Sequence, residues 1–504
     1  MTNFRTMNLH IDTRRIKGKR DAMIYGHFIE HFHRQIYGGI FDPGNPLSDA
    51  EGFRTDVIKA LRRIKVPVLR WPGGCFVSAH HWKDAVGPRR VPGFDKAWRV
   101  EEPNTFGTDE YIAFCRKVGC EPYICTNAGS GGAEEMSDWV EYCNLPHEGP
   151  WAKQRIAGGH AEPYGVKYWS IGNENYLGGE IGAKSAAEWG RFVTESAKMM
   201  KRVDPRIELS AAALADLDWN INLLRNCGER LRWISLHGYW DGLWQDNTFA
   251  GYEASMVFTN TLEDQVARVR GLLAAMGLQK RIRIAFDEWN LRGWHHPRVD
   301  TGLEPEEYIT PRDLNDDNRC YTMADAVFTA CFLNMANRNC DIVGMANFAP
   351  VVNTRGCIYT HKDGIVLRPA YHVFDLYVNN LGETVLDTYT SDDPVLEVRD
   401  KAGNRAETGA LDTIATLNAE GGIVIAAVNK DAANPREFRV VWPGGSIPSG
   451  YCIHTLTGTG TESCNDIDHT GAAPEPPRAA AYKPEDTIRL LPHSVNIIRF
   501  GADL

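Results

Sequence analysis

Short apolar runs alternate with amphipathic stretches from about residue 20 to residue 350. Runs rich in β-branched and aromatic residues are typical of strands, and apolar residues that recur every three or four positions are typical of helices. The pattern predicts strands at Ala22–Ile29, Val66–Trp71, Glu121–Thr126, Val166–Ile171, Ile207–Ala213, Arg232–Leu236, Ile282–Phe286 and Asp341–Ala346. It predicts helices at Asp56–Ile64, Thr108–Val118, Ala133–Tyr142, Ser185–Val203, Trp219–Asn226, Leu262–Met276 and Tyr321–Asn337. Regular alternation over eight units predicts an α/β protein whose parallel sheet closes into a (β/α)8 TIM barrel.

The pattern changes after about residue 380, where strand-like runs follow one another without intervening helices. These runs lie at Thr413–Leu417, Ile423–Val428, Glu437–Val441 and Thr487–Leu491. Such a succession predicts a C-terminal all-β sandwich over residues 381–504. The barrel would then occupy residues 21–380, and we expect residues 1–20, with a strand at Met7–Ile11, to join the sandwich.

Unusual polar residues follow the predicted barrel strands, at the ends where enzymes with this fold carry their chemistry. They are Glu30, Cys75, Asn127, Asn173, Glu174, His237, Tyr239, Glu288 and Asn347. An open doubly wound sheet would instead call for a glycine-rich phosphate loop after the first strand. The segment Gly26-His-Phe-Ile-Glu-His31 is not such a loop.

Two of these residues are carboxylates on separate strand ends. Glu174 follows the fourth strand between Asn173 and Asn175, and Glu288 ends the seventh strand. Either glutamate alone could be a solvated strand exit or the cap of the next helix. Together they favour acid/base or nucleophilic chemistry.

The bulk properties exclude several classes of partner. A formal net charge of −10 argues against nucleic acid or an anionic membrane surface. The sequence starts without an apolar signal-like run and has no segment long enough to span a bilayer. Its 12 cysteines form no C-x-x-C pair, so we expect reduced thiols and a cytoplasmic protein.

Histidines also occur close together, as in His31-Phe-His33, His80-His81 and His295-His296. No carboxylate or cysteine stands beside them at a metal-ligand spacing, so we expect no metal site and no cofactor.

Six motifs together resemble glycoside hydrolase family 51, which consists mainly of α-L-arabinofuranosidases. They are Gly26-His-Phe-Ile-Glu-His31, Arg70-Trp-Pro-Gly-Gly74, Trp82-Lys-Asp-Ala-Val-Gly-Pro88, Gly172-Asn-Glu-Asn175, Ser235-Leu-His237 and Asp287-Glu-Trp-Asn290. The resemblance runs from about residue 20 to residue 370. It implies a retaining mechanism with Glu174 as the acid/base and Glu288 as the nucleophile.

The same resemblance implies a set of substrate-binding residues. The set is Glu30, Cys75, Asn173, His237, Tyr239, Trp294 and Asn347. Asn173 would bind the hydroxyl next to the anomeric carbon, and His237 and Tyr239 would orient the nucleophile and border the glycone. For Glu30, an ion pair with Arg70 is an equal alternative.

Three positions depart from the family pattern. Cys75 stands where many members have Asn, Arg292 stands where many have Trp and displaces it to Trp294, and Gly344 stands where Gln is common. A thiol is a weak hydrogen-bonding substitute for an amide, so the sugar-recognition shell differs from the family's. Cys75 either contacts the sugar or packs beneath the pocket.

The sequence therefore predicts a retaining, exo-acting hydrolase that removes terminal α-L-arabinofuranosyl residues from arabinose-containing oligosaccharides. Another furanosidase, a β-xylosidase or an endo-β-glucanase could use the same two glutamates. A non-catalytic sugar-binding protein is the alternative from a different class. The resemblance also implies a homo-oligomer, a hexamer or a trimer.

Overall fold

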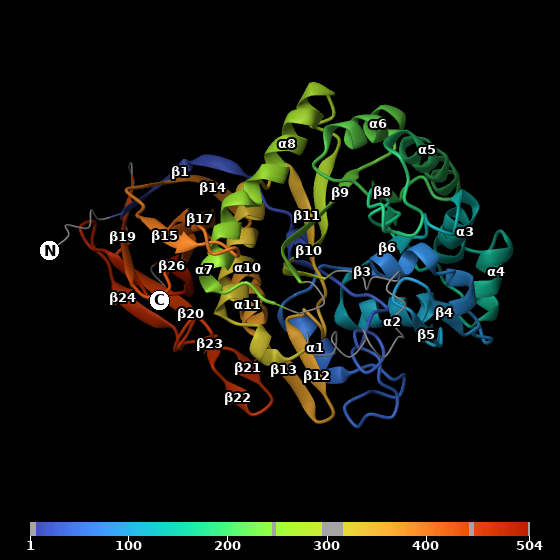
Figure 1. Cartoon of the computed structure of the whole chain (residues 1–504), viewed down its shortest axis with the longest axis horizontal. Helices are drawn as coiled ribbons and strands as arrows, with labels where there is room; N and C mark the ends of the chain where they lie inside the picture. The colour runs from blue at the N-terminus through green and yellow to red at the C-terminus, as the bar shows by residue number, and fades with distance from the viewer. Residues whose placement is uncertain (1–6, 244–247, 295–315, 443–447, 502–504) are drawn as a thin grey trace.

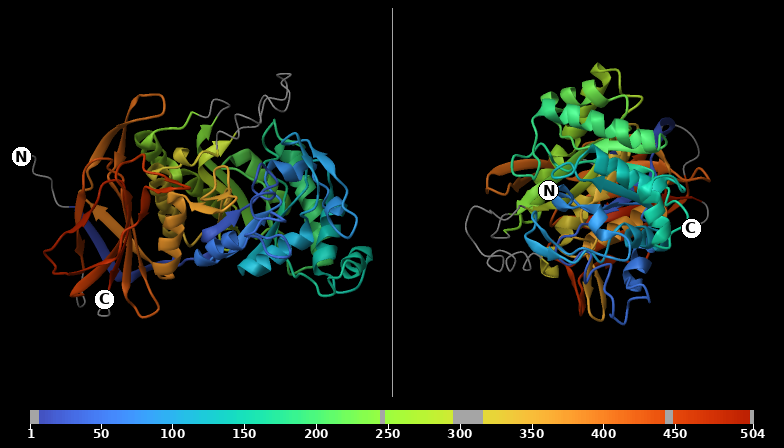
Figure 2. Two further views of the ribbon diagram at one scale, coloured as in Figure 1. Left: turned by 90° about the horizontal axis from the view of Figure 1, so that it is seen from below. Right: turned by 90° about the vertical axis from the view of Figure 1, so that its right-hand side faces the viewer.

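Two β-rich parts lie side by side in the computed structural model, which describes residues 7–243, 248–294, 316–442 and 448–501 (Figure 1). Helices α10 (Met323–Arg338) and α11 (Pro369–Asn380) stand between them and contact strands of both (Figure 2, left). No helix within the described ranges combines the length and the apolar character needed to cross a membrane.

The first part is a barrel of eight parallel strands in the order β8-β7-β6-β3-β2-β11-β10-β9. Their bounds are β2 Gly26–Phe28, β3 Val68–Trp71, β6 Glu121–Thr126, β7 Tyr168–Ile171, β8 Glu208–Ala211, β9 Trp233–Leu243, β10 Arg283–Trp294 and β11 Val343–Phe348. The two ends of this order meet, because the backbone N–H of Ala213 donates to the carbonyl of Ser235 at 3.0 Å. The predicted (β/α)8 barrel is confirmed.

Six helices around the barrel begin and end close to the predicted residues: α1 Thr55–Arg63, α2 Thr108–Val118, α3 Ala133–Asn144, α5 Ala186–Val203, α6 Leu217–Cys227 and α8 Leu262–Ala275. Two short helices, α4 Pro150–Ala157 and α7 Tyr252–Phe258, were not predicted. Local capping explains the starts of two helices. Ser185 and Glu188 form a capping box at α5, and Thr322 and Asp325 form one at α10.

The first predicted strand is wrong in its first half. Ala22–Tyr25 is a 3-10 helix, η1, and only Gly26–Phe28 is a strand. The side chain of Asp21 accepts a hydrogen bond from the backbone N–H of Met23 at 3.2 Å. This local cap satisfies a helical turn in an apolar segment whose composition favours a strand.

Strands β9 and β10 continue well beyond the predicted ends at Leu236 and Phe286. They remain paired in parallel as far as Leu243 and Trp294, beyond His237 and Glu288. In the β10 extension the described side chains on both faces are buried, so the sequence lacks the alternation of apolar and polar residues by which a strand with one solvent-exposed face is predicted.

The second part is a sheet of ten strands, ordered β23-β20-β26-β18-β17-β14-β1-β19-β25, with β24 beside β20. The bounds are β1 Met7–Lys19, β14 Thr384–Ser391, β17 Leu411–Leu417, β18 Ile423–Asn429, β19 Arg436–Val441, β20 Gly450–Gly458, β23 Ala472–Pro474, β24 Arg478–Ala481, β25 Ile488–Leu490 and β26 Ser494–Phe500. Leu9, Ile425, Phe438 and Ile498 from four of these strands share one buried core, so the sheet folds over itself. The predicted C-terminal all-β part is confirmed, and the boundaries at residues 20 and 380 stay predictions.

The described residues also form four short hairpins. They pair β4 Gly93–Asp95 with β5 Val100–Glu102, β12 Ile358–His361 with β13 Gly364–Leu367, β15 Val395–Arg399 with β16 Arg405–Gly409, and β21 Asn465–Asp466 with β22 His469–Thr470.

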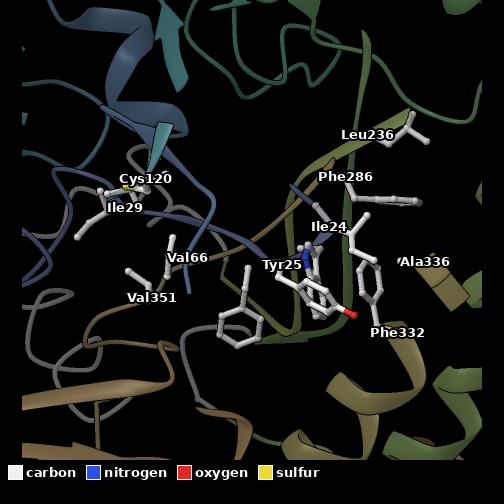
Figure 3. Packing of buried hydrophobic residues seen from close by; sticks show 14 of the residues in the cluster. Ile24, Tyr25, Ile29, Val66, Cys120, Leu236, Phe286, Phe332, Ala336 and Val351 are labelled. Carbon is white, nitrogen blue, oxygen red and sulfur yellow. The ribbon is translucent and has the colours of Figure 1, made fainter. Parts of the chain in front are cut away.

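Aromatic packing fixes helix α10 against the barrel. Phe332 lies near Phe286, Ile24 and Tyr25 (Figure 3), and its ring stacks on that of Trp289 with centroids 3.5 Å apart. Trp289 is fully buried and is adjacent in sequence to Glu288. The helix between the two parts therefore supports the strand that carries the expected nucleophile.

Gly344 lies at the opposite end of the barrel from the expected sugar pocket. It is the second residue of β11, and a Cβ atom there would come within 2.4 Å of Arg283 Cζ and 2.6 Å of the Trp233 ring. Glycine is needed here because the guanidinium and the indole occupy the side-chain space. The expectation that Gly344 bears on sugar recognition is therefore wrong.

We expect Gly344→Ala to lower the free energy of unfolding by about 1–3 kcal/mol, because the added methyl overpacks a filled site. Urea unfolding measures the change. The matched control is Gly271→Ala on the exposed face of α8, where a Cβ meets nothing within 4 Å. That change should stabilise the protein by about 0.5–1 kcal/mol, since alanine favours a helix. A Gly344→Ala variant as stable as wild type would contradict the packing described here.

Candidate active site

Glu174 is held by a strained turn at the end of β7. Gly172 has a φ of +69°, and Glu174 itself has a φ of +46°, which is uncommon for a residue other than glycine. Such strain is retained where the surroundings enforce it, and it concentrates at functional sites. The turn brings the Glu174 carboxylate to His237, whose Nδ1 lies 2.8 Å from Oε1.

Glu288 is held through both of its carboxylate oxygens. Arg70 Nη1 donates to Oε2 at 2.8 Å, and the Tyr239 hydroxyl donates to Oε1 at 2.7 Å. Two donors from two different strands fix the plane of the carboxylate. This is the environment that a carboxylate nucleophile requires.

The two glutamates lie close together. An oxygen of Glu174, a ring nitrogen of His237 and an oxygen of Glu288 are all within 4.8 Å of one another. Retaining glycosidases place their carboxyl groups about 5–5.5 Å apart, whereas inverting enzymes need about 6.5–9.5 Å to admit a water. The spacing therefore matches direct nucleophilic attack.

His237 is a buried cation at the centre of this group. Burial lowers its pKa, but Glu288, Asp287 and Glu174 outweigh burial and raise the pKa to about 10. The protonated ring can donate to Glu174 from Nδ1, while its Nε2 lies 3.5 Å from Asp287 Oδ1. The imidazolium thus links the two strand ends that carry the carboxylates.

Asp287 anchors the other side of His237. It accepts hydrogen bonds from the hydroxyls of Tyr123 at 2.7 Å and Ser235 at 2.6 Å. Burial raises its pKa, but Arg70 and His237 outweigh this and hold the pKa below its usual range. Asp287 is fully buried, so its charge acts on Arg70 and His237 and does not reach a substrate.

The Glu30 side chain packs against Gly73 and Gly74, which follow strand β3. Its Oε1 accepts from the backbone N–H of Phe76 and from Trp98 Nε1, each at 3.0 Å. A Cβ at Gly73, whose φ is +154°, would come within 2.5 Å of the Glu30 side chain. The alternative ion pair between Glu30 and Arg70 does not occur in the described structure. Burial, and then the charge of Glu288, raise the pKa of Glu30 to about 8.

Comparison with known proteins identifies the family. The α-L-arabinofuranosidase 1 domain model matches residues 60–256, and the α-L-arabinofuranosidase C-terminal domain model matches residues 287–494. The intracellular exo-α-(1→5)-L-arabinofuranosidase of Halalkalibacterium halodurans is 38% identical over 357 residues, covering 69% of this chain and 70% of that protein. α-L-arabinofuranosidase C of Emericella nidulans is 34% identical over 476 residues, covering 90% of this chain and 89% of the relative.

The crystal structure of the Thermotoga maritima α-L-arabinofuranosidase, an arabinose complex, superposes with a TM-score of 0.87 at 34% identity, covering 98% of this chain and 99% of that one. The chain belongs to the α-L-arabinofuranosidases of glycoside hydrolase family 51. It is thus a glycoside hydrolase.

Two asparagines of the family motifs have different surroundings. Asn173 accepts from Arg70 Nη2 at 2.9 Å, and its buried Nδ2 has no protein partner among the described residues. That amide hydrogen is therefore available to a sugar hydroxyl. Asn347 instead donates to the backbone carbonyl of His27 at 2.9 Å, which joins β11 to β2. Its role as a sugar ligand stays a prediction.

Cys75 begins the 3-10 helix η2 (Cys75–Ala79) and is half-buried. Its sulfur lies within 4.8 Å of carboxylate oxygens of Glu174 and Glu180. Burial raises the pKa of the thiol well above its ordinary value, with nearby carboxylates adding to the shift. The thiol is therefore protonated at neutral pH. It lies beside Glu174 and Glu180, a position that agrees both with contact to the sugar and with packing beneath the pocket.

Glu180 is a site residue that the sequence analysis missed. It is buried, accepts a hydrogen bond from the Ser78 hydroxyl at 2.6 Å, and lies close to Cys75. Burial is the main cause that raises its pKa to about 8, and Glu174 adds to it. One feature of the sequence could have indicated Glu180: it is the single acidic residue between Glu174 and Glu188, in the loop after the fourth strand.

Arg292 belongs to an ion cluster that lies outside the carboxylate group. It is 2% exposed and pairs with Asp241 at 2.6 Å and Asp325 at 3.0 Å. Lys401, from the C-terminal part, also pairs with Asp241 at 2.6 Å. Arg292 thus ties β9, β10 and α10 together instead of contacting Glu174 or Glu288. The side chain of Trp294 lies outside the described residues.

Two groups of described side chains have the proximity of metal ligands: Cys75 with Glu174 and Glu180, and Glu174 with His237 and Glu288. A metal needs a deprotonated thiol or a neutral imidazole. The raised pKa values of Cys75 and His237 oppose both requirements at neutral pH.

Glu30→Gln should change how stability depends on pH. The unfolded carboxyl ionises near pH 4.5 and the folded one near pH 8, so its protonated form stabilises the fold fully below pH 4.5 and this contribution is lost as pH rises through 8. The free energy of unfolding of Glu30→Gln relative to wild type should therefore increase by up to about 1.4 kcal/mol per pH unit between these values.

Urea unfolding over this pH range measures the difference. Glu420→Gln, on an exposed turn, is the control and should show no such trend. A difference between Glu30→Gln and wild type that stays constant with pH would contradict a protonated Glu30.

Proposed function

We propose that the protein hydrolyses terminal α-L-arabinofuranosyl bonds of arabinose-containing oligosaccharides with retention of configuration. The observation that carries this proposal is the separation of at most 4.8 Å between oxygens of Glu174 and Glu288 in a site of this family. The reaction needs two carboxyl groups and water, so the proposal includes no cofactor and no metal.

Glu288 is the proposed nucleophile. Its ionised carboxylate attacks the anomeric carbon and forms a covalent glycosyl–enzyme ester, while the aglycone leaves. Arg70 and Tyr239 hold both oxygens through hydrogen bonds, so the attacking oxygen is oriented before the substrate arrives. The Tyr239 hydroxyl also remains hydrogen-bonded to the Glu288 carboxylate while the attack neutralises its negative charge.

Glu174 is the proposed acid/base. It protonates the leaving oxygen in the first step and takes a proton from water in the second, when that water attacks the ester. His237 Nδ1 lies 2.8 Å from Oε1 and orients the Glu174 carboxyl group. The proposed glycone contacts are Asn173, through its free amide hydrogen, and Glu30 as a hydroxyl ligand.

Two relatives support the substrate class and the location. The proteins from Halalkalibacterium halodurans and Bacillus subtilis are named intracellular exo-α-(1→5)-L-arabinofuranosidases. All twelve cysteines of this chain are free thiols, which agrees with a reducing cytoplasm. The homo-oligomer, a hexamer or a trimer, rests on the family resemblance alone.

A panel of nitrophenyl glycosides tests the function. We expect the α-L-arabinofuranoside to be cleaved with a kcat/KM at least about tenfold above the β-D-xyloside and the β-D-galactofuranoside, and no cleavage of a β-glucan. Proton NMR of the first turnovers should show the α-anomer of arabinose, because double displacement retains configuration. Initial release of the β-anomer would contradict the retaining mechanism. A preference for the xyloside or for a glucan would contradict the proposed arabinofuranoside substrate.

Alanine variants of the two glutamates should fail in different ways. Glu288→Ala should lose several orders of magnitude on every substrate, and azide should restore turnover with an inverted glycosyl azide. Glu174→Ala should lose about 10²–10⁴-fold on an arabinose disaccharide and far less on an activated aryl glycoside, and its azide product should be retained. Equal losses on both substrates in Glu174→Ala, or an active Glu288→Ala, would contradict these roles.

A further inference from the structure

Arg355 occupies a sharply constrained turn between β11 and β12, outside the motifs that identify the family. The two preceding residues, Asn353 and Thr354, have φ angles of +54° and +48°. Two consecutive left-handed residues other than glycine are strained, so the turn persists only because its surroundings enforce it.

Neighbouring side chains fix the backbone on both sides of Arg355. Arg368 Nη1 donates to the carbonyls of Thr354 at 2.7 Å and Gly356 at 2.9 Å. Asn290, two residues after Glu288, donates to the carbonyl of Arg355 at 3.1 Å. The turn is thereby connected to the strand that carries the proposed nucleophile.

The guanidinium of Arg355 is a buried cation without a protein counter-ion in the described structure. The residue is 8% exposed, and its Nε and Nη1 are buried without a hydrogen-bond partner. Its Nη2 donates to no described residue either. The buried arginines nearby differ in this respect, since Arg292 pairs with Asp241 and Asp325, and Arg368 pairs with Asp316.

The position of this cation relates it to the catalytic group. The guanidinium carbon lies 5.5 Å from the ring centroid of Tyr239, whose hydroxyl donates to Glu288. An aromatic face offsets only part of the free energy that burying an unpaired cation costs. A guanidinium carries five hydrogen-bond donors and no acceptor, so an oxygen acceptor is what completes its environment.

We propose that Arg355 is a specificity-determining residue that donates hydrogen bonds to an acceptor oxygen of the bound substrate. The proposal rests on the proposed arabinofuranosidase function and deepens it. The oxygen has two sources, a hydroxyl or ring oxygen of the arabinofuranosyl unit, or a carboxylate on the sugar to which that unit is linked.

The experiment compares Arg355→Met, which keeps the length of the side chain and removes the donors, with wild type on three substrates. These are nitrophenyl α-L-arabinofuranoside, a neutral arabinose disaccharide, and arabinofuranosyl-uronic acid. We expect kcat/KM to fall about ten- to a hundredfold, as for a lost hydrogen bond to a charged group, mainly through a higher KM. A loss on all three substrates assigns the contact to the arabinofuranosyl unit, and a loss confined to the uronic acid substrate assigns it to the carboxylate.

Two further measurements separate substrate contact from structural support. Arg355→Ala should regain activity when guanidinium chloride is added at low, non-denaturing concentration, and Arg355→Lys should retain part of the affinity. Arg232→Met is the matched control, because Arg232 also lies over an aromatic ring, that of Trp233, at the other end of the barrel. It should keep wild-type constants, and thermal unfolding should show that all variants remain folded.

Unchanged kinetic constants of Arg355→Met on all three substrates would overturn the proposal while leaving the arabinofuranosidase function intact. A wild-type protein inactive on every arabinofuranoside would instead overturn the proposed function. In that case calorimetric titration of wild type and Arg355→Met with arabinose and with the uronic acid still decides whether Arg355 binds either, and equal affinities would reject it.

Discussion

The guanidinium of Arg70 is the contact on which the arrangement of the active site depends. It is fully buried on β3, yet it bonds Glu288 on β10 at 2.8 Å and Asn173 after β7 at 2.9 Å, and it lies 3.7 Å from Asp287. Burying a guanidinium costs several kcal/mol, which only paired carboxylates and satisfied donors offset. Its partners come from strands that meet only when the barrel closes, so folding and assembly of the site are one event.

His237 gives the second positive charge of the same network. Together, Arg70 and His237 face Asp287 and Glu288, so two cations balance two buried carboxylates. The balance explains how strand ends this rich in acids pack without repulsion. It also joins Glu174 to the network through His237, whose Nδ1 lies 2.8 Å from Glu174 Oε1.

The sequence was sufficient to predict the barrel and the two glutamates, because both follow from local signals. Strand and helix periodicity is local, and a carboxylate after a strand end is visible without tertiary information. Gly344, Arg292 and Glu180 were not predictable in the same way. Their roles depend on neighbours distant in sequence: Gly344 on Arg283, Arg292 on Asp325, and Glu180 on Ser78 and Cys75. The 3-10 turn at Ala22–Tyr25 was missed for a local reason. The composition of the apolar run favours a strand, but the hydrogen bond from Met23 N–H to the Asp21 side chain stabilises a helical turn instead.

The remaining carboxyl groups explain how a site with several acids can bind a neutral sugar. Burial raises the pKa of Glu30 and of Glu180 to about 8, so at neutral pH each is mostly a protonated acid. A protonated carboxyl both donates and accepts, as a sugar hydroxyl does, whereas a carboxylate only accepts. Keeping these two protons limits the negative charge around Glu288, the proposed nucleophile. Burial thus keeps two of the acids neutral beside Glu174 and Glu288, to which the proposed mechanism gives the chemistry.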